Sequence, residues 1–334
     1  MRVGIAGVGF MGSTHAAAWV ETPAQIVGFV AGSPESARPL AQKYGAKVFP
    51  DFSSMLDEVD VVDICTPTHL HVPMILEAAA RGKHIVCEKP LALTVKDALE
   101  AVHACRQAGV HLHVAHVVRF FPEYALAKQI IDQGQIGRIA TLRLLRGSYR
   151  PKKPVGNWFL DESKSGGILV DLMIHDMDYA RWVAGEVESV FARKVSAVYH
   201  DSPVDYGLVI LKHRNGAISH LAGAWAYPPP TFRTRFEISG DRGMIEFDSQ
   251  ATSPIENLTV KPYAEAPDVG LPSSPVRENP YTAEIKEFYA AITEGKMPRV
   301  TAEDAVAAVQ IAVAAVQSAR SGEVVYLELL SGGD

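Results

Sequence analysis

The chain has 334 residues, 48% of them hydrophobic and 21% charged, with a formal net charge of -6; this composition excludes a disordered chain and, at this length, suits two globular domains. Its 32 basic residues are outnumbered by 38 acidic ones, so we expect no nucleic-acid partner. No apolar run approaches the roughly 20 residues that span a bilayer, no leader sequence is visible and only three cysteines occur, so we expect no membrane association and a cytoplasmic protein.

The first part of the chain alternates short apolar runs with longer helical patterns. Strands are predicted at 3–6, 25–31, 61–65, 84–87 and 111–114. Helices are predicted at 12–20, 34–44, 71–81 and 95–108. This alternation is typical of βαβ units, whose right-handed crossovers build a doubly wound parallel sheet. We therefore expect residues 1–118 to form an α/β domain.

After residue 118 the pattern changes to longer alternating segments. Such alternation predicts antiparallel strands with one covered face. The strands are expected at 140–146, 189–199, 206–213, 217–225 and 233–239. Helices are expected at 123–132, 168–183, 281–294 and 302–320, the third of them after an exposed, proline-rich loop at 263–280. Residues 119–334 are thus predicted to form a second domain of the α+β class.

A glycine-rich turn stands between the first predicted strand and the first predicted helix. It contains Gly7, Gly9 and Gly12, with Phe10 and Met11 between the last two glycines. In a dinucleotide-binding turn the first glycine permits the tight turn, the second lets the backbone approach a pyrophosphate, and the third lets helix and strand pack closely. The helix N-terminus offers free amides to the same anion. We therefore predict that this turn binds NAD or NADP.

The end of the second predicted strand lacks the carboxylate that commonly binds the adenosine ribose of NAD. The residues there read Val30-Ala31-Gly32-Ser33. Because a carboxylate would repel a ribose phosphate, its absence tilts the prediction slightly toward NADP, with Ser33 and Arg38 as candidate phosphate partners. Arg38 also suits an ordinary solvent-exposed helix position, and both interpretations stay open at this point.

Two polar motifs follow neighbouring parallel strands. Thr66, Pro67 and His71 come directly after the strand at 61–65, and Glu88-Lys89-Pro90 ends the strand at 84–87. Open α/β sheets bind ligands at the carboxyl ends of their strands. Both motifs are therefore placed where a cofactor would lie.

A third motif lies on the helix predicted at 168–183. Gly166-Gly167 precedes Asp171, His175 and Asp178, whose spacing of i, i+4 and i+7 places them on one helix face. A histidine transfers protons near neutral pH without a large pKa shift. No two histidines show the His-x-x-x-His spacing with a nearby acid, so we expect no metal site.

Together these motifs resemble the glucose-fructose oxidoreductase, inositol dehydrogenase and rhizopine-catabolism family, often called the Gfo/Idh/MocA family. The glycine turn, the Thr-Pro-x-x-x-His stretch, Glu-Lys-Pro and Gly-Gly-x-x-x-Asp-x-x-x-His occur in the family's order over nearly the whole chain, with Arg119-Phe120 and Trp158-Phe159 in support. The resemblance implies a Rossmann domain at 1–118. It also implies a substrate-binding and oligomerisation domain at 119–334 with a large open, mainly antiparallel sheet.

The resemblance further implies an NAD(P)-dependent dehydrogenase or reductase that acts on CH–OH groups of a sugar, cyclitol or keto derivative. It assigns catalysis to Lys89, Asp171 and His175. Chemistry supports this, because alcohol oxidation needs a base for the hydroxyl proton and a cation beside the developing alkoxide. Substrate contacts are expected from these three residues and from Arg119 and Trp158. Beside the glycine turn, the expected cofactor contacts are Thr66, Pro67, His71, Glu88 and Lys89.

Several alternatives remain open from the sequence. Asp171 and His175 also suit a buried polar pair that orders the helix, and Arg119 also suits a bridge between the domains. A cofactor-sensing regulator on the same fold, or an NAD-dependent redox-assisted glycoside hydrolase, would carry the same motifs. An open sheet needs a cover, so we expect a homodimer or homotetramer.

Overall fold

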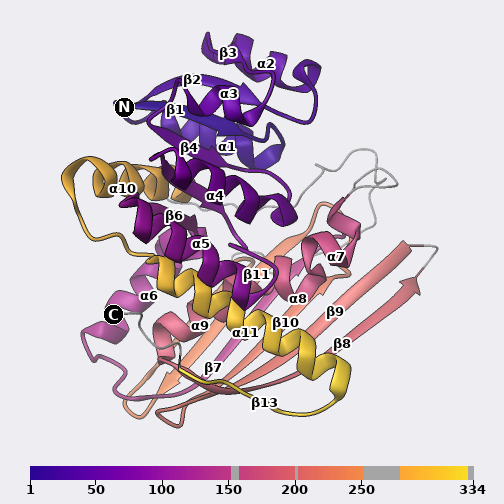
Figure 1. Cartoon of the computed structure of the whole chain (residues 1–334). Helices are drawn as coiled ribbons and strands as arrows, with labels where there is room; N and C mark the ends of the chain where they lie inside the picture. The colour runs from indigo at the N-terminus through magenta and orange to yellow at the C-terminus, as the bar shows by residue number, and fades with distance from the viewer. Residues whose placement is uncertain (152–157, 200–201, 252–278, 330–334) are drawn as a thin grey trace. The chain divides into compact units, whose positions relative to one another are not determined.

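Two compact units make up the structure, a computed structural model that describes residues 1–151, 158–199, 202–251 and 279–329 (Figure 1). Unit 1 comprises Met1–Phe121 and Val276–Val309, and unit 2 comprises Pro122–Pro275 and Gln310–Asp334. The sequence-based prediction has a single division at residue 118, whereas unit 1 also includes a later segment of the chain. Within the described ranges, no helix combines the length and apolarity needed to cross a membrane.

Unit 1 is built on a six-stranded parallel sheet with strand order β3-β2-β1-β4-β5-β6. This doubly wound order confirms the predicted Rossmann fold. The sequence missed β3, because two residues are too few to show a pattern. The strands are β1 (Arg2–Ala6), β2 (Gln25–Val30), β3 (Lys47–Val48), β4 (Val61–Ile64), β5 (His84–Glu88) and β6 (Leu112–Ala115).

Local signals set the ends of the helices of unit 1. The Thr94 hydroxyl accepts a hydrogen bond from the Asp97 amide at 3.1 Å and caps α5, which ends at Gly109 in the left-handed region. Asn279 caps α10 in the same way. The helices are α1 (Phe10–Trp19), α2 (Pro34–Tyr44), α3 (Phe52–Leu56), η1 (Thr68–Leu70), α4 (His71–Ala80), α5 (Val95–Ala108), η2 (Val117–Phe120) and α10 (Pro280–Glu294).

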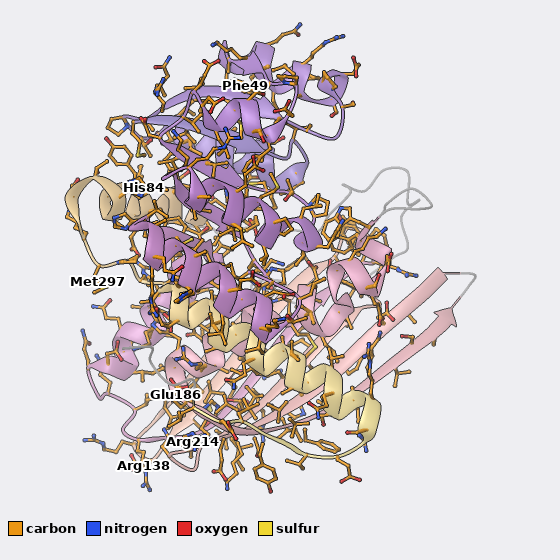
Figure 2. All side chains as sticks on the ribbon, viewed as in Figure 1. Phe49, His84, Arg138, Glu186, Arg214 and Met297 are labelled. Carbon is orange, nitrogen blue, oxygen red and sulfur yellow. The ribbon has the colours of Figure 1, made fainter. Side chains whose placement is uncertain are left out.

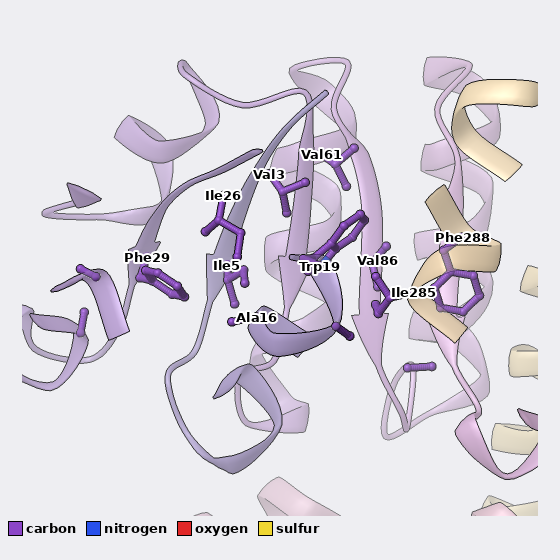
Figure 3. Packing of buried hydrophobic residues seen from close by; sticks show 14 of the residues in the cluster. Val3, Ile5, Ala16, Trp19, Ile26, Phe29, Val61, Val86, Ile285 and Phe288 are labelled. Atoms are coloured by element: carbon purple, nitrogen blue, oxygen red, sulfur yellow. The ribbon is translucent and has the colours of Figure 1, made fainter. Parts of the chain in front are cut away.

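The core of unit 1 joins the sheet to α1 and α10 (Figure 3). Trp19 from α1 and Ile285 and Phe288 from α10 are fully buried with the strand residues Ile5 and Val86. Full burial of an apolar side chain of this size contributes about 1.5–3 kcal/mol. Helix α10 is therefore an integral part of the Rossmann unit, although six of the seven strands of the second sheet separate it from β6 in the sequence.

Unit 2 is built on a seven-stranded sheet with strand order β12-β11-β7-β10-β9-β8-β13. Neighbouring strands are antiparallel except β7 and β10, which are parallel. The predicted, mainly antiparallel sheet is thus confirmed. Its strands are β7 (Ile139–Ser148), β8 (Val187–Tyr199), β9 (Ser202–His213), β10 (Ile218–Trp225), β11 (Phe232–Gly240), β12 (Met244–Asp248) and β13 (Val325–Tyr326).

Short helices accompany this sheet, and α8 and α9 pack against β7, β9 and β10. The last helix, α11, begins in unit 1 and ends in unit 2. The helical segments are α6 (Pro122–Asp132), η3 (Trp158–Leu160), α7 (Glu162–Ser165), α8 (Gly167–Asp171), α9 (Ile174–Ala184) and α11 (Ala302–Ser321).

Three histidines form an aromatic row in unit 1. His84 lies at the start of β5 (Figure 2), with its ring centroid 5.0 Å from that of His111, which stacks 5.6 Å from His113. The buried His113 ring stacks in turn on Phe288 at 5.0 Å. Burial, together with the charges of His111 and His84, lowers the pKa of His113 to about 3. His113 is therefore a neutral aromatic side chain at pH 7.

We expect His113 to destabilise the protein in acid. An unfolded histidine takes up its proton near pH 6.5, whereas the folded His113 does so only near pH 3. The unfolded state therefore binds more protons in this interval, and the free energy of unfolding falls as the pH decreases through it. In urea titrations at about pH 7 and pH 4.5, the free energy of unfolding of His113→Phe should therefore decrease less between the two pH values than that of the wild type. The exposed control His103→Gln should keep the wild-type pH dependence, and a His113→Phe variant that also keeps it would contradict the assignment.

Candidate active site

The glycine turn joins β1 to α1 by close backbone packing. A Cβ added to Gly7 would lie 2.3 Å from the carbonyl oxygen of Cys65, and one added to Gly12 would lie 2.0 Å from that of Gly7. The φ angle of Gly7 is also positive, at 98°. Two of the three glycines are thus required by the fold itself.

Gly9 differs from its neighbours, because a Cβ added there would meet nothing within 4 Å in the described structure. It is exposed and directly precedes α1, whose first turn has no side-chain cap among the described residues. Open space before an uncapped helix N-terminus attracts an anion through free amides and the helix dipole. Phe10 and Met11 follow in the first turn of α1. Gly9, Phe10 and Met11 together fit the diphosphate of a dinucleotide.

The segment after β2 carries the candidate phosphate partners Ser33 and Arg38. Ser33 caps α2, accepting a hydrogen bond from the Ser36 amide at 3.4 Å. The Arg38 guanidinium lies 3.3 Å from the Glu35 carboxylate, and both side chains are exposed. An exposed cation is thus available after β2, together with a neighbouring carboxylate that the sequence-based argument did not weigh.

His71 ties the two strand-end motifs of unit 1 together. Its Nδ1 lies 2.8 Å from the carbonyl oxygen of Pro90, and its Nε2 lies 2.9 Å from that of Thr66. The ring is buried, and burial lowers its pKa although both carbonyls oppose this shift. Because both nitrogens face protein carbonyls, His71 links the ends of β4 and β5. Thr66 and Pro67 are the partly exposed residues of this motif.

Glu88 is the buried last residue of β5 and directly precedes Lys89. One carboxylate oxygen, Oε1, is 3.2 Å from Nε2 of His15, and the other accepts a hydrogen bond from the Lys89 amide at 3.0 Å. The Lys89 side chain is partly exposed, and the Lys89–Pro90 peptide bond is cis. The Glu88 contacts therefore fix the backbone from which Lys89 projects.

His15 is the centre of a buried polar cluster that the sequence-based argument missed. Its Nδ1 lies 2.9 Å from Asp63, which also accepts a 2.7 Å hydrogen bond from the Trp19 indole. Burial alone would lower the pKa of His15, but the charges and hydrogen bonds of Asp63 and Cys65 raise it well above its ordinary value. A signal was present in the sequence, because Asp63 interrupts the apolar strand β4 and a buried carboxylate requires a partner.

A second buried carboxylate, Glu284 of α10, contributes to the same region. It is fully buried, and burial raises its pKa well above the ordinary value, with His15 opposing the shift and Glu88 and Asp63 reinforcing it. The surroundings of Glu284 therefore favour its protonated form. The ligand atoms of His15, Asp63 and Cys65 lie within 4.8 Å of one another, but burial raises the pKa of the Cys65 thiol, which disfavours the thiolate that binds metals.

Arg119, expected as a substrate ligand, is fully buried in unit 1. Its Nη1 donates hydrogen bonds to Asp304 and to the carbonyl oxygen of Arg299, each at 3.0 Å. Arg299 returns a 2.8 Å hydrogen bond to the carbonyl oxygen of Arg119. These contacts fasten η2 to the start of α11, so they favour a packing role for Arg119 over a substrate contact.

The helix predicted at 168–183 is in fact two helices, which corrects the expected single helix face. Helix α8 ends at Asp171, and α9 begins at Ile174. At the break the Met173 amide bonds the carbonyl oxygen of Ile168 at 3.0 Å, five residues back. Gly166 and Gly167, both with positive φ, turn the chain from α7 into α8. Asp171 and His175 thus flank a break in the helix.

The predicted catalytic side chains differ in their exposure. Asp171 is 8% exposed, His175 is partly exposed, and Asp178 is buried. Trp158 is partly exposed in η3, and its ring contacts Phe159, which packs in turn on Trp225. Lys89 belongs to unit 1, whereas Asp171 and His175 belong to unit 2, so the meeting of all three at one site stays a prediction.

Comparison with known proteins bears on both units. Residues 1–116 match the model of an oxidoreductase family with an NAD-binding Rossmann fold, and residues 128–328 match the model of that family's C-terminal alpha/beta domain. The chain belongs to the Gfo/Idh/MocA family. The predicted class, a nicotinamide-dependent oxidoreductase with a Rossmann domain, is thereby confirmed.

Similar members of the Gfo/Idh/MocA family include dehydrogenases of known name. An inositol 2-dehydrogenase of Rhizobium meliloti is 30% identical over 326 residues, which are 95% of this chain and 96% of that protein. A levoglucosan dehydrogenase of Pseudarthrobacter phenanthrenivorans is 32% identical over 287 residues, 74% of this chain and 73% of that protein. The solved structure of a levoglucosan dehydrogenase with NADH and L-sorbose has a TM-score of 0.84 at 26% identity and covers 99% of this chain and 100% of that one.

The glycine turn of this Gfo/Idh/MocA oxidoreductase predicts opposite results for two substitutions. Gly9→Asp should fold normally, because its side chain enters open space, but should weaken NADH binding at least about tenfold by placing a negative charge before α1. Gly12→Ala should instead lower the free energy of unfolding by about 1–3 kcal/mol through overpacking. Calorimetric titration with NADH and urea denaturation measure the two effects. Wild-type NADH affinity in Gly9→Asp would place the diphosphate elsewhere.

Proposed function

We propose that the chain transfers a hydride between a nicotinamide dinucleotide and a hydroxyl-bearing or carbonyl carbon of a sugar, a cyclitol or a keto derivative. The observation that carries the proposal is the match over 95% of the chain to an inositol 2-dehydrogenase. The motifs around Lys89, Asp171 and His175, which resemble those of the family, support it. The levoglucosan dehydrogenase bound to NADH and L-sorbose supports the same substrate class. A screen of myo-inositol, levoglucosan and related ketoses with both cofactors tests it.

The proposed chemistry divides between three side chains. When bound, the dinucleotide supplies the hydride acceptor for oxidation. His175 Nε2 or Nδ1 takes the hydroxyl proton of the substrate, and the Lys89 ammonium stabilises the developing alkoxide oxygen. Asp171 orients the imidazole or holds a neighbouring substrate hydroxyl. In the reductive direction His175 returns the proton to the carbonyl oxygen.

The roles of Lys89 and His175 predict a loss of turnover without a loss of cofactor. Lys89→Ala and His175→Ala should each lower kcat about a hundredfold or more, the usual scale for positioned acid-base groups, while the Kd for NADH changes little. The pH profile of kcat/KM should lose one ionisation in His175→Ala. Stopped-flow and steady-state assays with the best substrate of the screen measure these values.

Matched controls are available on the surface of unit 1. Lys96 and His103 are exposed, so Lys96→Ala and His103→Ala should keep the wild-type kcat. If Lys89→Ala and His175→Ala also keep it, these residues are structural, and a regulator that only senses the cofactor becomes the better interpretation.

We further propose that NADP(H) is accepted at least as well as NAD(H). The support is the missing carboxylate at 30–33 and the exposed guanidinium of Arg38, 3.3 Å from Glu35. A ribose phosphate would compete with Glu35 for Arg38. Arg38→Ala should therefore reduce kcat/KM for NADP more than for NAD, by about three- to tenfold. A strong wild-type preference for NAD, unchanged in Arg38→Ala, would contradict the proposal.

We propose that the protein forms a homodimer or homotetramer through the outward face of the seven-stranded sheet, which is the face opposite α8 and α9. Ile218, Tyr206 and Val195 are exposed there, 49%, 44% and 62% respectively, and exposed ion pairs such as Arg143–Glu237 share this face. Apolar side chains mixed with both signs of charge suit a self-complementary interface. Light scattering measures the mass of the protein in solution, and a monomeric mass would contradict the proposal.

The three free cysteines and the use of a dinucleotide support a cytoplasmic location.

A further inference from the structure

One cross-strand row of the seven-stranded sheet contacts three consecutive helical segments of unit 2. The paired residues of this row are Lys194 on β8, Gly207 on β9, Gly223 on β10 and Arg146 on β7. We call these four residues the helix seat. Gly207, Gly223 and Arg146 are all buried.

The two glycines of the helix seat form a hollow for Met173. A Cβ on Gly223 would lie 2.4 Å from Cγ and 2.7 Å from Sδ of Met173, and one on Gly207 would lie 2.6 Å from the same sulfur. Met173 is fully buried. No larger residue could stand at either strand position without displacing the methionine. The break between α8 and α9 is therefore held against one point of the sheet.

Arg146 fixes the start of α9 beside this hollow. Its Nε and Nη2 donate two parallel hydrogen bonds to the Asp176 carboxylate, each 2.9 Å long. The two side chains are 3% and 2% exposed, so the pair is desolvated, and its bidentate geometry sets the orientation of Asp176 as well as its distance. At the other end of the row, Lys194 forms an ion pair with Glu162 of α7.

The residues that contact the helix seat are close in the sequence to the predicted catalytic residues. Asp171 lies two residues before Met173, and His175 lies two residues after it and directly before Asp176. The seat therefore holds the backbone on both sides of His175, at Met173 through shape and at Asp176 through charge. A misplacement of about 1 Å at a catalytic group lowers the rate by up to about a hundredfold.

We propose that Gly207, Gly223, Met173 and the Arg146–Asp176 pair are positioning residues that hold Asp171 and His175 in their catalytic arrangement. This inference rests on the proposed function for its kinetic consequence, but not for its structural one. The seat lies wholly in unit 2, whereas the glycine turn lies in unit 1. Its disruption should thus change the chemical step and leave the binding of the dinucleotide unchanged.

The shape of the seat is tested by Gly223→Ala. The added methyl group displaces Met173, so kcat should fall about ten- to a hundredfold at saturating substrate, while the Kd for NADH stays within about twofold of wild type. The double variant Gly223→Ala, Met173→Ala makes room for the methyl group and should regain part of the lost kcat. Kinetics use whichever of myo-inositol and levoglucosan the wild type oxidises.

The ion pair between Arg146 of the helix seat and Asp176 is tested by Asp176→Asn, which keeps the shape of the side chain but removes the carboxylate charge. We expect kcat to fall at least about tenfold with the NADH Kd again unchanged. The matched control is Asp57→Asn, which breaks the exposed pair with Arg81 in unit 1 and should keep wild-type kcat. Gly240→Ala is the control for packing, because its Cβ would lie 2.0 Å from the Ile136 carbonyl oxygen, away from α8 and α9.

Hydrogen exchange supplies a measurement that needs no substrate. In Gly223→Ala and Asp176→Asn, amides of 167–184 should exchange faster, while amides of β1, β4 and β5 keep wild-type rates. If the wild type turns over no compound of the screen, the proposed substrate class fails, and exchange alone still tests the seat. The inference is overturned if the seat variants lose thermal stability as Gly240→Ala does but keep wild-type kcat, or if exchange at 167–184 does not change.

Discussion

The interior of unit 1 depends on the cation that His15 places between two buried carboxylates. Its ring nitrogens lie 2.9 Å from Asp63 on β4 and 3.2 Å from Glu88 on β5. An unpaired buried charge costs several kcal/mol, and the contacts of His15 with both carboxylates supply this pairing in the interior. His15 belongs to α1, the helix that begins at the glycine turn, and Glu88 directly precedes Lys89. One buried side chain thus ties the segment that fits a diphosphate to the strand end that carries the predicted catalytic lysine.

Unit 2 meets the same constraint with different residues. The Arg146 guanidinium and the Asp176 carboxylate satisfy each other through two hydrogen bonds in the interior, and the helix they hold carries His175. In both units, therefore, one member of a buried ion pair is the sequence neighbour of a predicted catalytic residue. A bidentate or bridging pair resists rotation as well as separation, which is the property that a site built on strand ends and a broken helix requires. The Arg119–Asp304 pair in unit 1, with a 3.0 Å contact, fastens η2 to α11.

The sequence predicted those features whose signals are local. The glycine turn and the apolar parallel strands each occupy a few consecutive residues, and the structure confirms the doubly wound sheet that they indicate. The break after Asp171 was not predictable in this way, because the residues around it keep a helical spacing. Directly after this break, Met173 packs against two glycines that come later in the chain. The return of α10 to unit 1 and the partners of His15 are non-local for the same reason.

Motif residues that look equivalent in the sequence separate into two groups once their surroundings are known. Gly7, Gly12 and His71 are required by the packing of the Rossmann unit, so a protein that kept this fold for any purpose would need them. Gly9 is different, because a side chain there would meet no other atom of the described structure. The fold gives no reason for glycine at this position, whereas a ligand that approaches the backbone closely does. A bound dinucleotide is therefore indicated less by the number of glycines in the motif than by Gly9, the single one that the packing of the protein does not require.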